Sequence, residues 1–496
     1  MTETRTDERS LGDYLARIAA DPDAYRTVSR TVDPAAFDVT GLLGGLDQHR
    51  RYEAVHFRNP LDLTGRPSQF SVLANLFATR SRIAQMLHLN GEDVGPELGL
   101  QYGELVNRRT APQLVPAGTA PVHECVLRGE DATMSILPVV RHAEMDLGPV
   151  LTMAHVMKGP DDGFYNVTFA KTFPDETGRR GGVTIHTPDL SRLLREWEAR
   201  GRRFPVVNVL GHHPAFWLGS LAVTPYGTNE YETIGGFLGH PLRLTPSVTW
   251  GEDFLVPADA EIVIEGVVHT ADTVAEGPFG EFTYYYGKAT APRCEITAIS
   301  HRRDAIFHDV HPTHAEHRCL WLFPGREARL LAAVRAAVPG TSTVRIPFMG
   351  GSLSGYLSIA KAHDSDGQQA ILAAFAADHF LKHVIAVDTD VDLMNDQEVL
   401  WALNVRFQAD RDLVRLTGAK GIRMDPSATV HPGAGAPQAL TAKLGFDATK
   451  PLTSPFPPRA DTPAPGFERY AFTDWFGPSD SARLTAQLAA RRALAE

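Results

Sequence analysis

The sequence predicts a multidomain protein of mixed α/β and α+β class, on three observations. Its 496 residues suffice for two or three domains with sizeable cores. Short runs rich in β-branched residues dominate from 116 to 305, whereas strand and helix patterns alternate from 306 to 450. We therefore expect an N-terminal α/β segment over 1–115, a strand-rich domain over 116–305, a C-terminal α/β domain over 306–450, and a Pro-rich linker with a last helix over 451–496.

The first segment mixes both kinds of element. Apolar spacing predicts helices over Leu11–Ala20 and Gln69–Leu87 and a strand near Arg51–Phe57. The Pro-rich stretch Ala111–Val122 marks a domain edge, because proline interrupts both regular structures.

The strand-rich region contains short apolar runs bounded by turn residues. The clearest runs are Val183–Ile185, Val206–Leu210, Glu261–Val268 and Glu295–Ser300. Thr187-Pro188-Asp189 precedes a leucine-rich amphipathic stretch and predicts a capped helix. Few helices among many short strands favour a partly open barrel or an α+β layer.

The C-terminal domain shows a regular alternation. It predicts, in order, helix Arg326–Val338, strand Thr343–Phe348, strand Tyr356–Ala362, helix Gly367–Leu381, strand His383–Val387 and helix Asp396–Phe407. The last predicted helix, Ser481–Leu494, carries leucines that suit docking on a neighbouring domain or subunit.

Composition narrows the function classes. A net charge of −11 argues against an electrostatic nucleic-acid footprint. Cys125, Cys294 and Cys319 are far apart and form no CxxC pair, so each is expected to be a small core residue in a reducing compartment. The N-terminus shows no signal-peptide pattern, and no run approaches the ~20 apolar residues of a membrane span. We expect a cytoplasmic protein that binds neither nucleic acid nor membrane.

The stretch Glu276-Gly-Pro-Phe-Gly-Glu281 places two carboxylates around a Gly-Pro turn. Because Gly and Pro interrupt the strand period, the two acids are able to converge on one site. Paired carboxylates divide acid and base roles when burial and neighbouring charges separate their pKa values. A tight turn with two solvated acids is the alternative, and spacing alone does not decide between them.

Two further segments carry candidate polar groups. In the alternating strand that starts at Tyr165, Asn166 and Thr168 share one face and Lys171 lies at the edge. Glu230 stands in the first turn of a predicted helix, where an acid is usually a cap or a partner of the helix dipole.

A strand that starts after Lys382 ends in three acids, Asp388, Asp390 and Asp392, for which capping and solvation are favoured over metal binding. Histidines recur at 308, 311, 314 and 317, but Pro312 breaks any helix that would align them, so pocket lining or surface positions are expected. No nicotinamide, ATP, serine-hydrolase or zincin motif stands in a credible context.

Taken in order, these segments resemble the UbiD family of decarboxylases, which use prenylated FMN. The resemblance covers about residues 50 to 450. Its motifs are Asn166-Val-Thr-Phe-Ala-Lys171, Asn229-Glu230, Asp253-Phe-Leu-Val-Pro257, Glu265-Gly, Glu276-Gly-Pro-Phe-Gly-Glu281, Lys382 with Val387-Asp-Thr-Asp-Val-Asp392, Met424-Asp-Pro-Ser427 and Lys443-Leu-Gly-Phe-Asp-Ala-Thr449.

The resemblance implies a split-β-barrel domain that binds the flavin and a C-terminal α/β domain that supports a homodimer or higher homo-oligomer. It also implies a divalent metal on the flavin phosphate, Mn²⁺ or Mg²⁺, because amide and carboxylate oxygens are hard donors, with K⁺ as a further candidate ion. The implied metal ligands are Asn166, Glu230 and either Asp189 or His186. The implied flavin-binding residues are Asn166, Val167, Thr168, Phe169, Ala170, Lys171, Pro188, Asp189, Glu230 and Lys382.

The family's catalytic trio is usually Glu, Arg and Glu, and here Glu276, Lys171 and Glu281 match those positions. Lysine keeps the positive charge of arginine but lacks its planar bidentate fork. The resemblance implies that Lys171 pairs with Glu276 and helps to orient the substrate carboxylate. Glu281 is then expected to act as general acid, with a pKa raised by burial and by its neighbour.

The implied reaction is reversible, non-oxidative decarboxylation of an α,β-unsaturated or aromatic carboxylic acid. Side chains supply no electron sink for the carbanion, so a cofactor is required, and a flavin prenyltransferase is its expected supplier. Two other functions stay open at this point. They are an ordinary FMN-dependent redox enzyme, and a non-catalytic, partner-dependent subunit on the same scaffold.

Overall fold

The structure is a computed structural model that describes residues 8–89, 95–161, 163–185, 187–321, 325–347, 351–431, 438–460 and 476–484. The chain divides into two compact units, residues 1–91 with 100–325, and residues 92–99 with 326–496. Helix α4 (Pro96–Val106) is shared between them. The mixed, multidomain α/β and α+β class predicted from the sequence is confirmed.

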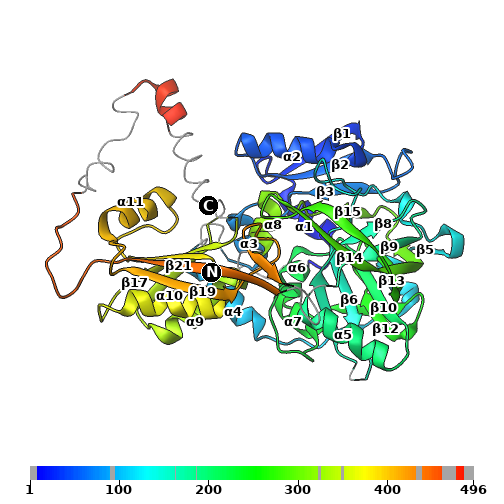
Figure 1. Ribbon diagram of the computed structural model, residues 1–496. Coiled ribbons are helices and arrows are strands. Elements are labelled where there is room, and N and C mark those ends of the chain that lie inside the picture. Colours follow the sequence, from blue (N-terminus) through cyan, green and yellow to red (C-terminus); the bar gives the residue numbers. More distant parts are fainter. Residues whose placement is uncertain are drawn as a thin grey trace. The chain divides into compact units, whose positions relative to one another are not determined.

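The first unit contains three sheets and short helices (Figure 1). Its other helices are α1 (Leu11–Ile18), α2 (Asp38–Gln48), α3 (Arg80–Met86), α5 (Pro188–Ala199), α6 (Pro214–Ser220), α7 (Glu230–Leu238) and α8 (Ala315–Trp321). Its strands are β1 (Tyr25–Val32), β2 (Ala54–Pro60), β3 (Ser71–Ala74), β4 (Gln113–Leu114), β5 (Cys125–Arg128), β6 (Ala154–Lys158), β7 (Tyr165–Phe169), β8 (Thr172–Pro174), β9 (Arg180–Val183), β10 (Phe204–Leu210), β11 (Arg243–Ser247), β12 (Gly251–Pro257), β13 (Ile262–Gly280), β14 (Tyr286–His301) and β15 (Ile306–His308).

The eight-stranded sheet positions the candidate site. Its order is β7-β6-β10-β13-β14-β9-β8, with β5 paired to β14, and its named pairings are antiparallel. Strands β13 and β14 form a long hairpin at its centre. Strand β7 stands at one end of this order, so the side of its main chain that faces away from β6 is available to partners outside the sheet.

Local sequence explains the capped helix α5. Thr187 is its N-cap and accepts the Leu190 N–H, Pro188 occupies the first turn, and Leu190 and Leu193 are buried. The predicted helix at this place is therefore confirmed.

The helix predicted over Gln69–Leu87 is wrong in its first half. Residues 71–74 form β3, which pairs with both β2 and β15, and only α3 (Arg80–Met86) is helical. Val72 and Leu73 are fully buried in this sheet, and a short apolar run does not by itself distinguish a strand from a buried helix.

The second unit is an α/β layer structure, as predicted. Its strands are β16 (Thr341–Arg345), β17 (Ser354–Ile359), β18 (His383–Asp388), β19 (Leu413–Lys420), β20 (Thr429–His431) and β21 (Gln438–Ala448), in the order β16-β17-β18-β21-β19 with β20 on β21. Its helices are α9 (Glu327–Ala337), α10 (Asp366–Ala377) and α11 (Asp396–Arg406). Helix α11 lies on one face of the sheet and α9 and α10 lie on the other (Figure 1).

Alternation along β21 explains these two layers. Gly445 and Asp447 face α10, where a Cβ on Gly445 would lie 2.1 Å from Ile371, whereas Phe446 and Ala448 pack in the cluster under α11. The last helix, predicted from Ser481, begins earlier, since residues 478–484 are helical; residues 485–494 of the prediction lie outside the described residues.

Two of the three cysteines, Cys294 and Cys319, are buried and unpaired, as expected of small core residues, whereas Cys125 is half-buried. Among the described helices, none combines the length and the apolar character needed to cross a bilayer.

Candidate active site

The two acids of the Glu276–Glu281 stretch stand at the end of β13, where its pairing with β14 is irregular. Glu276 is opposite Ala289, but the register shifts before Phe279, which is opposite Gly287. Gly277 has φ of 91°, and a Cβ there would lie 2.5 Å from the Gly287 carbonyl oxygen, so glycine is required. The register shift removes the strict alternation of side chains, and both carboxylates reach one cation.

That cation is Lys171, which follows β7. Its ammonium nitrogen lies 2.7 Å from Glu281 Oε1 and 3.9 Å from Glu276 Oε1. It also lies 4.2 Å from the centre of the Phe279 ring, at a distance typical of a cation–π contact. Only 18% of the Lys171 and Glu281 side chains and 7% of the Glu276 side chain are exposed. The structure thus brings the three predicted catalytic residues together. Lys171 was expected to pair with Glu276, but its closer contact is with Glu281.

Helix α8 adds polar groups that the sequence did not assign to this site. Burial lowers the pKa of His317 to about 4, and the charge of Lys171 adds to the effect, so the imidazole is neutral at neutral pH. Arg318 donates to the Thr313 carbonyl at 2.8 Å and to the Tyr284 hydroxyl. In the sequence, the histidine repeat was the only sign of these groups. The predicted surface position is wrong for three of the histidines, because His308, His311 and His314 are buried.

A second cluster contains the predicted metal ligands. Glu230, the first residue of α7, is buried and accepts the Val167 N–H at 2.5 Å and the Thr224 hydroxyl at 3.3 Å. Burial raises the pKa of Glu230 to about 8, the charge of Asp189 contributes to the rise, and the two hydrogen bonds oppose it. The Asn166 side chain is close enough to lower the same pKa.

The donor set of this cluster fits a hard cation. Asn166 Oδ1 is buried and has no hydrogen-bond partner among the described residues. A cation bound there would satisfy this oxygen and offset the cost of a buried Glu230 carboxylate. Within the same described residues, no three His, Cys, Asp or Glu side chains are grouped so that they could hold a metal ion, and the candidate set here consists of one amide and two carboxylates. The alternative ligand His186 lies outside the described residues.

The main chain of β7 runs from one cluster to the other. Because Glu230 takes the Val167 N–H, the Phe169 N–H, two residues on, points to the same side of the strand. Thr168 and Phe169 are half-buried and Ala170 is buried, and the Lys171 carbonyl accepts the Thr184 N–H at 2.9 Å. Pro188 is exposed at the start of α5, next to half-buried Asp189.

Known protein families match most of the chain. Three domain families described for 3-octaprenyl-4-hydroxybenzoate carboxy-lyase match the chain: the N-terminal domain over residues 20–100, the Rift-related domain over 113–315 and the C-terminal domain over 321–448. The chain belongs to the UbiD family of carboxy-lyases.

Individual UbiD relatives match over nearly the whole chain. The anhydromevalonate phosphate decarboxylase of Aeropyrum pernix is 33% identical and covers 90% of this chain and 94% of its own length. The gallate decarboxylase of Lactiplantibacillus plantarum is 30% identical over 88% of this chain and 93% of its own. The structure of the UbiD-class enzyme HmfF from Pelotomaculum thermopropionicum in complex with FMN has a TM-score of 0.84 at 31% identity, and covers 94% of this chain and 100% of its own. An evolved dimeric form of HmfF in complex with prenylated FMN has a TM-score of 0.81 at 29% identity, over 95% of this chain and 100% of its own.

The remaining predicted cofactor residue of this UbiD chain, Lys382, belongs to the second unit. Its ammonium donates to Asp425 Oδ2 at 2.8 Å and to the Ser427 hydroxyl, both in the Met424-Asp-Pro-Ser427 motif. Within its own unit, Lys382 is therefore an ion-paired lysine at the start of β18.

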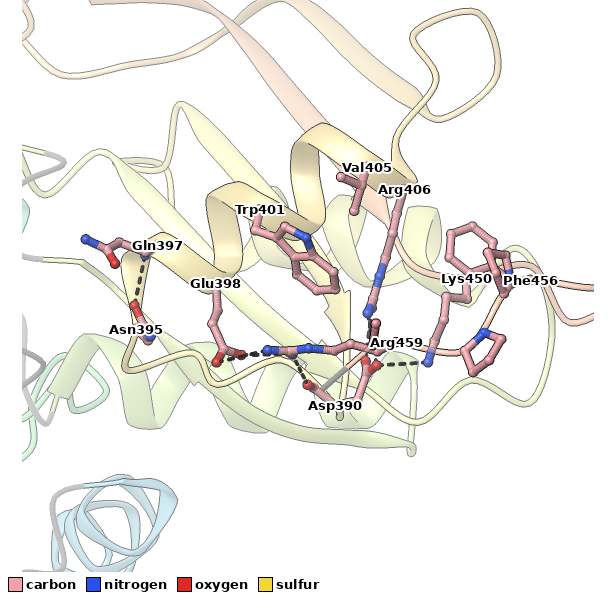
Figure 2. Close-up of a pocket in the computed structure, with 13 residues that line it drawn as sticks. Asp390, Asn395, Gln397, Glu398, Trp401, Val405, Arg406, Lys450, Phe456 and Arg459 are labelled. Carbon is pink, nitrogen blue, oxygen red and sulfur yellow. Dashed lines mark hydrogen bonds and ion pairs between the residues drawn. The ribbon is translucent and has the colours of Figure 1, made fainter. Parts of the chain in front are cut away.

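The acids that follow β18 are held by cations. Arg406 contacts Asp388 at 2.8 Å and Asp390 at 2.9 Å, and Lys450 contacts Asp390 at 3.0 Å. Asp390, Arg406 and Lys450 line a pocket of about 790 Å³ in the second unit (Figure 2). In the same pocket, the Arg459 guanidinium lies over the Trp401 ring and pairs with Glu398. Arg406 and Lys450 therefore hold Asp388 and Asp390 in ion pairs, which no sequence pattern indicated. The predicted capping role is wrong for α11, whose N-cap is Asn395.

Proposed function

We propose that this UbiD enzyme decarboxylates an α,β-unsaturated or aromatic carboxylic acid with prenylated FMN as its cofactor. The observation that carries the proposal is the largely buried contact of one ammonium with two carboxylates, Lys171 with Glu276 and Glu281. The substrates named for the relatives, anhydromevalonate phosphate, gallate and a phenolic acid, support the proposed class.

The proposed cofactor site consists of β7 and the Glu230 cluster. Asn166, Glu230 and Asp189 would hold a divalent cation, Mn²⁺ or Mg²⁺, against the flavin phosphate, which the orphaned Asn166 Oδ1 supports. The main chain of residues 167–171 would line the isoalloxazine. When bound, the prenylated flavin supplies the electron sink that carbanion chemistry needs.

Each of the three side chains has its own proposed role. Lys171 offsets the repulsion between two carboxylates and attracts the carboxylate of the substrate. Glu281 is the proposed general acid, which delivers a proton from its carboxyl group to the carbon that has lost CO₂. Glu276, whose Oε1 lies 3.9 Å from the same ammonium, helps to hold that ammonium in place.

The test is to coexpress the chain with a flavin prenyltransferase and to measure CO₂ release from gallate, a phenolic acid and an unsaturated aliphatic acid. Absorbance and intact mass of the bound cofactor identify the flavin. We expect a prenylated flavin and CO₂ release that needs no reductant. An unmodified flavin with reductant-dependent turnover would instead identify a redox enzyme. Copurification with a second protein, without cofactor, would identify a non-catalytic subunit.

A further inference from the structure

Asp146 is a buried carboxylate whose two oxygens hold two separate segments. It is 2% exposed. Oδ2 accepts the Ala143 N–H at 2.8 Å and closes a turn within its own loop, whereas Oδ1 accepts the Gly280 N–H at 2.7 Å. Gly280 is the last residue of β13 and immediately precedes Glu281.

The loop of residues 143–147, here called the 143–147 loop, makes two more hydrogen bonds to the same hairpin. The Leu147 N–H donates to the Pro278 carbonyl at 2.7 Å, and the Met145 N–H donates to the Tyr286 hydroxyl at 3.1 Å. The bonds to Pro278 and Gly280 flank Phe279 on both sides in the sequence. These hydrogen bonds therefore hold the peptide groups on both sides of Phe279.

Phe279 in turn supports the catalytic cation. Its ring packs with Val150 and Phe173 in a small apolar cluster and lies 4.2 Å from the Lys171 ammonium. A displacement of the Phe279 main chain would move both this ring and the adjoining Glu281. Catalytic groups tolerate little displacement, since misplacement by about 1 Å is able to cost on the order of 100-fold in rate.

We propose that Asp146 is a positioning residue for decarboxylation, which sets Glu281 and the Phe279 ring against Lys171 through the Gly280 N–H. This inference rests on the proposed function, because it concerns the same acids. The hydrogen bonds of the Asp146 carboxylate go to the main chain, at Ala143 and Gly280. Its effect is transmitted through one peptide group.

The first test is Asp146→Asn. The amide keeps the shape of the side chain but replaces one acceptor oxygen with a donor, so one of the two backbone N–H groups loses its partner. We expect kcat per flavin-loaded site to fall about tenfold, with KM and the flavin absorbance spectrum unchanged. A merely structural carboxylate would lower the yield or the melting temperature and leave kcat per loaded site intact.

Asp366→Asn is the matched control. Asp366 also accepts two backbone N–H groups, from Ala362 at 2.8 Å and from His363 at 2.9 Å, but it belongs to the second unit, whereas the proposed catalytic residues belong to the first. It is expected to leave kcat unchanged.

A second test needs no change of Asp146 and decides the matter if Asp146→Asn does not fold. A Cβ at Gly280 would lie 3.0 Å from the Ala143 Cβ, whereas its next neighbours lie at 3.6 and 3.7 Å. Gly280→Ala should therefore push β13 away from the 143–147 loop and lower kcat. Adding Ala143→Gly removes the close contact and should restore most of the lost rate.

The outcomes separate this inference from the proposed function. If Glu281→Gln is inactive while Asp146→Asn and Gly280→Ala keep the full kcat, the positioning role is wrong and the proposed function stands. A loss in Gly280→Ala that Ala143→Gly fails to restore also counts against the positioning role. If Glu281→Gln itself keeps full activity, the proposed function is wrong.

Discussion

The Lys171 ammonium lies 2.7 Å from Glu281 Oε1, more than an ångström closer than its 3.9 Å approach to Glu276 Oε1. The cation therefore contacts the proposed proton donor, Glu281, directly, and its contact with Glu276 is the longer of the two. A lysine forms this pair as a point charge on a flexible stem, without the fixed fork of an arginine. Both carboxylates depend on the same ammonium, so changes at these three positions should not act independently.

Glu281→Gln should lower kcat by about 10²–10⁴-fold, the range that a positioned general acid contributes. The glutamine fits the same space and still accepts a hydrogen bond from Lys171, so flavin content and fold should be retained. Single-turnover CO₂ release and flavin absorbance measure the two effects separately. Glu232→Gln changes a half-buried acid in α7 outside the proposed catalytic trio and should leave kcat unchanged.

Lys171→Met should lower kcat by at least about 100-fold, because two carboxylates are left without their shared cation. Lys171→Arg keeps the charge and should retain activity to within about tenfold, with any loss appearing mainly in KM, since the guanidinium presents its donors in another geometry. Steady-state kinetics on flavin-loaded enzyme compare the two. Equal kcat values for the methionine and arginine variants would contradict an electrostatic role for Lys171.

The local features of the site were predictable from the sequence, and its long-range contacts were not. Gly277 and Pro278 indicated that the acids need not alternate, and the register shift of β13 agrees with this. The Lys171 contact with Glu281 joins residues 110 positions apart and depends on how β7 and β13 are placed in one sheet. No periodicity in the sequence reports such a distance.

His317 and Asp146 show the same limit. The spacing of the histidines was visible, but the approach of His317 to Lys171 requires α8 to pack beside the end of β13. Asp146 resembles any loop aspartate until the Gly280 N–H is found 2.7 Å from its Oδ1. The β3 strand was missed for a related reason, since its partners β2 and β15 include a strand more than 200 residues away.

Metal binding at the Asn166 and Glu230 cluster should depend on pH. Because burial raises the pKa of Glu230 to about 8, a cation must displace a proton at lower pH. Mn²⁺ affinity of the flavin-free protein should therefore rise about tenfold per pH unit up to pH 8 and level off above it. Titration calorimetry from pH 6 to 9 measures this trend.

Two substitutions in helix α7 form a matched pair for that titration. Glu230→Gln should weaken Mn²⁺ binding by more than about tenfold and remove the pH trend, because the neutral amide releases no proton. Glu232→Gln, two residues along α7, changes charge by the same amount and should leave affinity and trend unchanged. Equal effects of the two variants would show that net charge, not ligation, governs binding.

The free energy of unfolding should depend on pH through Glu261, a buried residue immediately before β13. Burial raises the pKa of Glu261 to about 7, and the nearby Arg302 guanidinium, 3.8 Å away, and the Ile306 N–H oppose the rise. The folded state then binds this proton more tightly than the unfolded state, whose pKa is near 4.5. The resulting stabilisation is complete below pH 4.5 and is lost as pH rises to 7, at about 1.4 kcal/mol per pKa unit, or on the order of 3 kcal/mol in all.

Glu261→Gln removes this contribution, because the amide is neutral at every pH. Urea denaturation of the variant at pH 4.5, 6 and 8 should show a fall in unfolding free energy about 3 kcal/mol smaller than the unmodified chain shows over the same interval. Exposed Glu252, also in the first unit, provides the control, since Glu252→Gln should keep the fall. A denaturation series for Glu261→Gln that runs parallel to the unmodified chain would mean that Glu261 is already ionised in the folded protein at pH 6, with Arg302 and the Ile306 N–H outweighing its burial.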